Sequence, residues 1–453
     1  MSIACKPKED TDRRHILGPK SHLALFCWCQ IIVYFDRGVV SGMLSHISDE
    51  VPGAESKFVA GFLGGMFMLG YMIASPLFVR LSQQSRDWTV YAIVLGMAIL
   101  AGSAVLTYFL STSFAGLLVA RLLSGAGEAA FCSLAPPIID ESAPVGKKSL
   151  YVGLYFTFLY VGFGMGSAAC FVFDTWNSGR ILFLIEAGLV VPCVVVLLAL
   201  RKRLSVPDSI HEDTARSANG GGLWAQLKVI LSQPVFLLLS LGYGAFFFAF
   251  GAFAFWTPTV MKELYPESAN LATLAFGGVT ILTGVIGTAA GGIMMDYLSR
   301  RLSSHKRFAG YPDETIRVLS GVAICVVLCL LGMLFTFPTS FSSSIYVFLV
   351  FFAMGTLLLF SMTAPINIAI MYSVPAALKA QAMAVSTGLS HMIGDFPSPF
   401  AIGAIIDASG YKTAMLVTSG ILLAPAALWF GAGVVAKREG DAYETKPEVA
   451  NSA

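Results

Sequence analysis

Apolar residues in this chain gather into long runs that are separated by short polar segments. A helix needs about 20 residues to cross the hydrocarbon core of a bilayer, which is roughly 30 Å thick. Twelve runs approach or exceed this length, at residues 22–46, 58–81, 88–111, 114–140, 149–173, 181–201, 234–261, 271–298, 315–337, 342–373, 377–407 and 413–436. The pattern predicts an all-α membrane protein with twelve transmembrane helices.

One long polar interruption divides these runs into six and six. It predicts five segments: 1–21 (cytoplasmic N-terminal segment), 22–201 (first six-helix bundle), 202–233 (cytoplasmic linker with a short amphipathic helix near Leu223–Leu231), 234–436 (second bundle) and 437–453 (cytoplasmic tail). The spacings Gly61-xxx-Gly65 and Gly287-xxx-Gly291 recur at corresponding places in the two halves and allow close helix packing. Two such halves are typical of the major facilitator fold, in which substrate binds between them.

The composition fits a membrane protein. Hydrophobic residues make up 56% of the chain and charged residues only 12%, against about 25% charged in soluble domains. The net charge of +2 gives no reason to expect a nucleic-acid partner. With the N-terminus in the cytoplasm, that side carries 23 of the 29 Lys and Arg and the opposite side carries 4, so the positive-inside rule predicts both termini to be cytoplasmic.

The predicted spans also contain ionisable residues, which are costly at bilayer depth and usually mark a transport path. They are Asp36, Arg37, Arg121, Glu128, Glu186, His391 and Asp395. Asp36 and Arg121 lie at similar depth, so we expect them to meet, and Glu128 lies nearly two turns from Arg121 on the same helix face. These three residues predict a proton-responsive cluster; the alternative is a buried salt bridge that only fixes the packing of one bundle.

The other embedded groups carry weaker signals. Glu186 lies nearer the end of its span, where we expect a snorkelling or interhelical contact. His391 lies one turn from Asp395, which would orient and tune the imidazole, so we include both in the proton-coupling set; a packing role is the alternative. A single His–Asp pair is a poor metal site, and we expect neither a metal nor another cofactor.

Residues 121–167, "RLLSGAGEAAFCSLAPPIIDESAPVGKKSLYVGLYFTFLYVGFGMGS", resemble the helix 4 and helix 5 signatures of the Spinster branch of the major facilitator superfamily. Further matches to that family are "DR" at 36–37, "FAFWTP" at 253–258, "APINIAIMYSVP" at 364–375 and "HMIGDFPSP" at 391–399. The chain departs from the family pattern at Val33, Gln83 and Tyr160, where asparagine, aspartate and proline are common. These departures resemble plant and protist members.

The resemblance implies a secondary active transporter of lysophospholipid or sphingoid-type lipids, coupled to protons and working by alternating access. It implies a monomer among membrane lipids, in a lysosomal, vacuolar or late endosomal membrane rather than the plasma membrane; "DRRHIL" at 12–17 looks like a dileucine sorting signal. The alternative keeps the fold and the proton-coupling cluster but transports a small organic anion or another amphiphile. A membrane enzyme that uses His391 and Asp395 is disfavoured because no nucleophile or metal set accompanies them.

The resemblance and the residue chemistry together suggest where substrate binds. Arginine suits an anionic head group, aromatic rings suit an acyl chain, and neutral polar groups complete the site. The expected substrate residues are Arg37, Arg121, Glu128, Phe247, Phe250, Phe253, Thr363 and Asn367. The aromatic stripe has an alternative role as lipid-facing bulk. In "GGIMMDYLSRR", Asp296 and Arg300 match a superfamily motif, which implies a conformational latch.

Overall fold

The computed structural model describes residues 18–144, 147–204, 223–308, 310–375 and 378–444, and within these ranges the regular structure is entirely helical. The sorting-type string at 12–17 lies outside the described residues. The six main helices of the first half are α1 (Pro19–Glu50), α2 (Lys57–Ser82), α3 (Arg86–Leu110), α4 (Phe114–Ser142), α5 (Lys148–Ala169) and α7 (Ile181–Leu200). A short α6 (Trp176–Gly179) precedes α7. Ser56 and Ser85 accept backbone N–H bonds and so cap α2 and α3.

The second half begins after α9 (Leu223–Leu231), which forms where the sequence predicts an amphipathic helix. Its helices are α10 (Pro234–Leu264), α11 (Ala269–Ser303), α12 (Asp313–Thr336), α13 (Ile345–Phe360), α14 (Thr363–Tyr372), α15 (Lys379–Ser390), α16 (Ser398–Ile421) and α17 (Leu423–Glu444). Two spans predicted as continuous are interrupted. The run 342–373 breaks between α13 and α14, and the run 377–407 contains a π-helical turn, η8 (His391–Asp395), between α15 and α16.

Eleven helical stretches in the described residues are long and apolar enough to span a membrane. The last of them, Gln381–Ala442, has 62 residues, which as one straight helix would measure about 90 Å. The backbone leaves helical geometry inside it at Gly410, where φ is 81°, a conformation that glycine adopts without a Cβ clash. This break lies between the predicted spans 377–407 and 413–436; the count of twelve remains a prediction.

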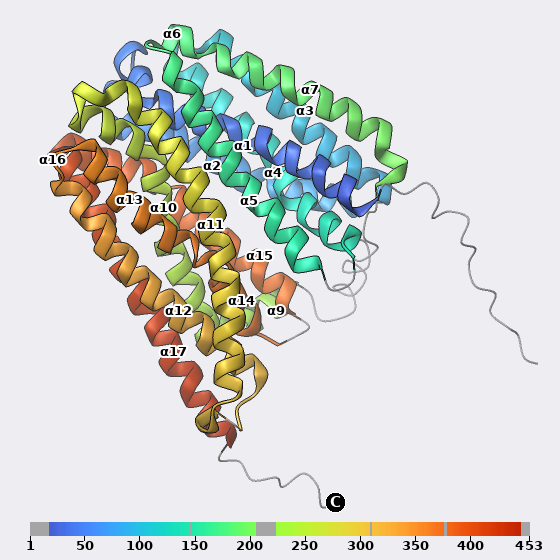
Figure 1. The fold of residues 1–453 in the computed structure, drawn as a ribbon. Coiled ribbons are helices and arrows are strands. Elements are labelled where there is room, and N and C mark those ends of the chain that lie inside the picture. The colour runs from blue at the N-terminus through green and yellow to red at the C-terminus, as the bar shows by residue number, and fades with distance from the viewer. Residues whose placement is uncertain (1–17, 145–146, 205–222, 309, 376–377, 445–453) are drawn as a thin grey trace, which may run out of the picture.

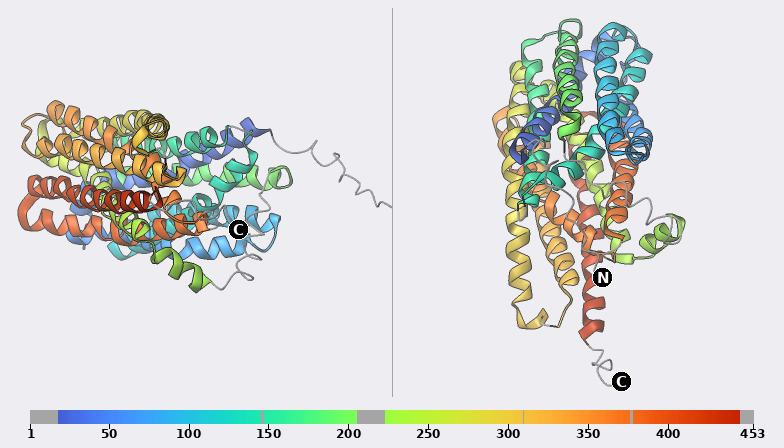
Figure 2. Two further views of the ribbon diagram at one scale, coloured as in Figure 1. Left: turned by 90° about the horizontal axis from the view of Figure 1, so that it is seen from below. Right: turned by 90° about the vertical axis from the view of Figure 1, so that its right-hand side faces the viewer.

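Two helices extend beyond the predicted runs. The first helix begins at Pro19 and continues to Glu50, beyond the predicted 22–46. Residues 437–444, in the predicted cytoplasmic tail, continue α17. The Tyr311 hydroxyl donates to Asp441, and the Tyr311 ring packs against Gly440. These tertiary contacts hold the polar end of α17 against the segment before α12, and Figure 2 shows this end extending beyond the first half.

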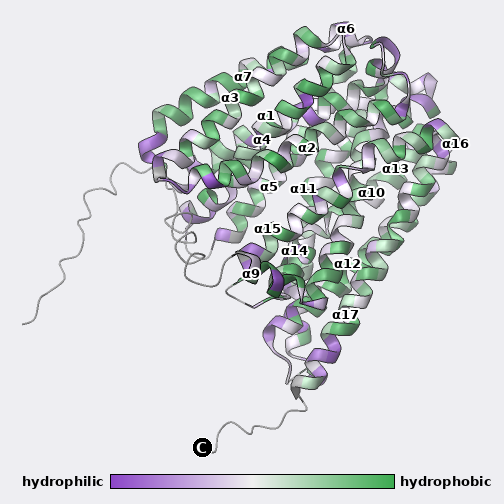
Figure 3. Ribbon diagram, turned by 180° about the vertical axis from the view of Figure 1, so that it is seen from behind, coloured by the Kyte–Doolittle hydropathy of each residue, from purple (hydrophilic) through white to green (hydrophobic). Residues whose placement is uncertain are grey.

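Each half packs mainly on itself, and the most extensive contacts between the halves are those of α5 with α11, α2 with α16 and α1 with α10 (Figure 1). Hydrophobic residues cover most of the helix lengths, and hydrophilic residues gather at the helix ends (Figure 3). This distribution matches helices that present their sides to lipid.

The halves are hydrogen-bonded to each other near the end of the molecule opposite the two termini. Asp407 of α16 accepts bonds from Ser56 Oγ at 2.6 Å and from the backbone N–H groups of Lys57 and Phe58, both at 2.9 Å. It thereby satisfies the free N–H groups at the start of α2 from across the interface. One turn further along α2, a Cβ atom at Gly61 would lie 2.4 Å from Phe400 Cα, so this approach requires glycine.

Candidate functional site

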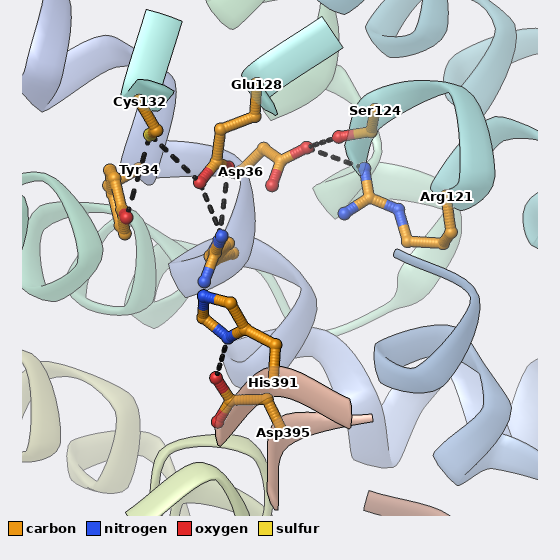
Figure 4. A network of polar contacts seen from close by, with 9 residues as sticks. Tyr34, Asp36, Arg121, Ser124, Glu128, Cys132, His391 and Asp395 are labelled. Carbon is orange, nitrogen blue, oxygen red and sulfur yellow. Dashed lines mark hydrogen bonds and ion pairs between the residues drawn. The ribbon is translucent and has the colours of Figure 1, made fainter. Parts of the chain in front are cut away.

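Two crossed ion pairs join α1 to α4 inside the first half (Figure 4). Arg121 Nη2 donates to Asp36 Oδ2 at 2.8 Å, and these side chains are 3% and 1% exposed. Arg37 donates to both oxygens of Glu128, at 3.1 and 2.5 Å. The predicted meeting of Asp36 and Arg121 is confirmed. Adjacent residues on a helix point about 100° apart, so Asp36 and Arg37 reach different partners on α4.

A neutral side chain also contacts each of the two carboxylates, although Asp36 Oδ1 has no hydrogen-bond partner among the described residues. Ser124 Oγ donates to Asp36 Oδ2, and Cys132 Sγ lies 3.6 Å from Glu128 Oε1 and 3.8 Å from the Tyr34 hydroxyl. Each carboxylate is therefore held by an arginine and by one neutral side chain, and hydrogen bonds between charged groups are stronger than those between neutral ones. Protonation of either acid would remove its charge and release its arginine.

The Arg37 guanidinium lies between two aromatic rings. Its Cζ is 4.7 Å from the centroid of Tyr34 and 4.4 Å from that of Phe67 on α2, a cation–π geometry. The Arg37 side chain is 19% exposed, whereas Glu128 is fully buried. Arg37 is therefore the more accessible partner of this pair.

The second half contributes the His391–Asp395 pair. His391 Nδ1 lies 2.8 Å from Asp395 Oδ2, and the whole pair lies in the π-helical turn η8, an irregularity that is frequent at functional sites. The His391 ring contacts Tyr71 of α2 at 5.4 Å between centroids and points toward the ion pairs in Figure 4. Tyr71 lies one turn from Phe67, so α2 connects His391 to the Arg37 site.

Helices α10 and α14 add aromatic and neutral polar groups beside His391. The Phe247 ring lies 5.7 Å from the imidazole, and Phe250 contacts Phe360 at 5.3 Å. Asn367 Nδ2 donates to the Tyr243 hydroxyl at 3.4 Å and to the carbonyl of Thr363 at 2.8 Å. Thr363 and Asn367 lie in the first two turns of α14, directly after the interruption.

Phe253 occupies a different environment from Phe247 and Phe250. It is 2% exposed and packs against Phe352 at 6.0 Å between centroids. Three residues advance a helix by about 300°, so positions 247, 250 and 253 drift by about 60° per step and leave a common face. The Phe253 ring is not accessible to a substrate in this conformation, so its direct role in binding stays a prediction.

The expected latch residues, Asp296 and Arg300, lie one turn apart on α11 and are both exposed. No salt bridge among the described residues involves either of them. They lie in about the last two turns of α11. Their latch role stays a prediction for a conformation in which the molecule is closed at that end of α11.

Glu186 is the group whose surroundings differ most from expectation. It is 0% exposed, and within the described part of the chain neither carboxyl oxygen has a hydrogen-bond partner. The expected snorkelling contact is therefore wrong, and the interhelical contact that Glu186 makes involves no hydrogen bond. Glu186 is buried because α7 packs against both α1 and α3.

Several uncharged members of the site were not predicted from the sequence. Ser124 lies three residues after Arg121, Cys132 four after Glu128, and Phe67 and Tyr71 four apart on α2. Spacings of three and four place side chains on one helix face, and this signal was present for Ser124 and Cys132. Nothing in the sequence pairs Phe67 with Arg37 or Tyr71 with His391, because these contacts depend on tertiary packing.

Comparison with known proteins gives one consistent result. The sequence model of the Major Facilitator Superfamily matches residues 26–399. The probable sphingolipid transporter spinster homolog 2 of Arabidopsis thaliana is 30% identical over 438 residues, 91% of this chain and 86% of that protein. Human protein spinster homolog 1 is 28% identical over 407 residues, 85% of this chain and 72% of that protein.

Solved structures agree on the fold. The crystal structure of a bacterial homolog to the human lysosomal transporter spinster, in an inward-facing and unoccupied conformation, has a TM-score of 0.73. The two proteins are 16% identical, and the match covers 97% of this chain and all of the other.

Proposed function

Because the chain belongs to the spinster family of the major facilitator superfamily, we propose that it is a secondary active transporter of lysophospholipid or sphingoid-type lipids. Transport is coupled to protons and proceeds by alternating access. The protein is a multi-pass membrane transporter and not an enzyme. The sphingolipid assignment printed for the plant relatives supports this substrate class.

The observation that carries the proposal is the pair of crossed salt bridges inside an apolar bundle. Charges at bilayer depth are costly and usually serve transport. Here Asp36, Arg121 and Glu128 form the proton-coupling cluster of the first half, and His391 with Asp395 forms that of the second half. An anionic head group would compete with Glu128 for Arg37, so substrate binding and protonation act on the same guanidinium.

The substrate lies between the halves. Arg37 and Arg121 hold the head group, and Glu128 is the counter-charge of Arg37. Phe247 and Phe250 contact the acyl chain, and Thr363 and Asn367 supply neutral polar contacts. Phe253 supports this wall from the core side through Phe352. A lipid with one chain fits such a combination of charge and aromatic surface.

The topology completes the proposal. The chain crosses the membrane twelve times, as bundles 22–201 and 234–436 joined by linker 202–233, with both termini in the cytoplasm. The hydrogen bonds of Asp407 then close the non-cytoplasmic side, so this conformation is inward-facing, and Asp296 and Arg300 act as a latch when the cytoplasmic side closes. We place the protein, as a monomer, in a lysosomal, vacuolar or late endosomal membrane.

Transport by protein reconstituted in liposomes tests the proposal. Lysolipids and sphingoid bases with different head groups are offered with and without a pH gradient. We expect saturable transport of at least one of these lipids, and faster transport with the pH gradient than without it. The Arg121→Ala variant should no longer transport lipids that carry a phosphate group. Lys148→Ala, which removes an exposed cation of α5, serves as the control and should transport normally. Transport of small organic anions without any lipid transport would favour the alternative substrate class.

A further inference from the structure

Glu186 lies beside the crossed ion pairs without joining either of them. Phe183, three residues earlier on the same face of α7, packs its ring 5.6 Å from the Arg121 guanidinium carbon. Three charged groups act electrostatically on Glu186: Asp36 from α1, and Arg121 and Glu128 from α4. Glu186 therefore belongs to the same electrostatic group as the four paired residues.

Helix α3 also packs against α7 but adds no charge at this depth. The Arg201 guanidinium, just after α7, lies over Tyr91 near the start of α3, so the two helices run antiparallel. The acidic residue in the first turn of α3, Asp87, is consequently at the far end from Glu186. The neighbours that determine the charge state of Glu186 are those on α1 and α4.

The buried charges of this group do not balance. Within the described core of the first half, Asp36, Glu128 and Glu186 supply three carboxyl groups, and Arg37 and Arg121 supply two guanidinium groups. Both guanidinium groups are already paired. If all five residues were ionised, one negative charge would remain buried without a partner, and a lone buried carboxylate neutralises by taking up a proton.

We propose that Glu186 holds the coupling proton in this conformation, while the two arginines keep Asp36 and Glu128 ionised. The inference rests on the proposed proton-coupled function and adds Glu186 to it as the protonated site. When the Glu186 O–H bond breaks, the proton passes to water. The new Glu186 carboxylate then competes for the Arg121 guanidinium with Asp36, which is the only ion-pair partner of Arg121 among the described residues while Glu186 is protonated. Proton release thus loosens the link between α1 and α4.

Infrared spectroscopy of the reconstituted protein tests this placement without any transport measurement. A protonated carboxylic acid has a C=O stretching band separate from carboxylate bands, and the band shifts in D2O. We expect one such band in the wild type, its loss in Glu186→Gln, and a shifted frequency in Glu186→Asp, which keeps the number of carboxyl groups. Glu128→Asp serves as the matched control and should leave the band in place.

The outcomes separate this inference from the proposed function. A band that Glu186→Asp leaves unchanged and Glu128→Asp shifts would place the proton on Glu128 and overturn the inference. Absence of an acid band in the wild type would also overturn it. In transport assays, Glu186→Gln should lose the response to the pH gradient and Glu186→Asp should retain it. Failure of the wild type to transport any lipid would contradict the proposed function, while the infrared result would still decide where the proton is.

Discussion

Asp36→Asn tests how much the buried pair with Arg121 contributes to stability. The change keeps the shape of the side chain and leaves an acceptor for Ser124, but it removes the charge that balances Arg121. Two unit charges about 4 Å apart attract by about 4 kcal/mol at an effective dielectric constant of 20. Removing one partner of a buried pair costs about 3–5 kcal/mol in other proteins. Because Glu186 can ionise and compensate Arg121 in part, we expect a loss near the lower end, about 3 kcal/mol.

The assay is the free energy of unfolding of purified protein in mixed micelles. Lys148→Gln is the matched control: its pair with Asp140 has a similar distance, 3.0 Å, but both side chains are 47% exposed, so the loss should be within about 1 kcal/mol. The double variant Asp36→Asn/Arg121→Gln should be more stable than Asp36→Asn alone, because no uncompensated charge remains. Equal losses in Asp36→Asn and Lys148→Gln, or additive losses in the double variant, would refute the reasoning.

Two further predictions concern coupling and the closed end. Glu128→Gln should fold and transport lipid without responding to a pH gradient, because the remaining two carboxylates balance the two arginines. Glu141→Gln, at an exposed position of the same helix, is the control and should respond to the gradient like the wild type. An unchanged response in Glu128→Gln would contradict a role of Glu128 in proton coupling. Gly61→Leu should prevent the close approach of α2 to α16. Ser41 is 1% exposed, so a cysteine introduced by Ser41→Cys should then react faster with maleimide. Gly102→Leu, where a Cβ has open space, is the control, and equal labelling in both variants would show that the close contact is dispensable.

Sequence patterns predicted the parts of the fold that depend on helix length and polarity. The apolar runs located every main helix to within several residues, and the long polar interruption separated the two halves. The patterns could not locate the π-helical turn at His391–Asp395 or the break before Thr363, because both are local departures inside continuously apolar runs. The boundary at Glu444 depends on Tyr311, a contact between residues far apart in the chain.

Sequence reasoning about the site succeeded for charged residues and failed for their environment. The cost of burying a charge identifies Asp36, Arg121 and Glu128 without any structure. Which acid pairs with which arginine depends on the rotation of α1 against α4, and the sequence predicted Arg37 as a substrate residue without assigning it a partner. The structure pairs Arg37 with Glu128. The isolation of Glu186 depends on the faces that α1, α3 and α7 present to one another, which periodicity alone does not set.

The imbalance of three buried carboxyl groups against two guanidinium groups predicts opposite effects for the two kinds of charge removal. Removing an acid, as in Asp36→Asn, leaves two carboxylates for two arginines, so no proton is needed and the infrared acid band should disappear even though Glu186 is intact. Removing an arginine, as in Arg37→Gln, leaves three carboxyl groups for one guanidinium, so two protons are needed and the band should grow about twofold, since an unpaired buried carboxyl takes up a proton. If the protonation of Glu186 depended only on its own burial, Asp36→Asn would leave the band unchanged. Measuring both variants therefore distinguishes a cluster that titrates as one unit from an isolated buried acid.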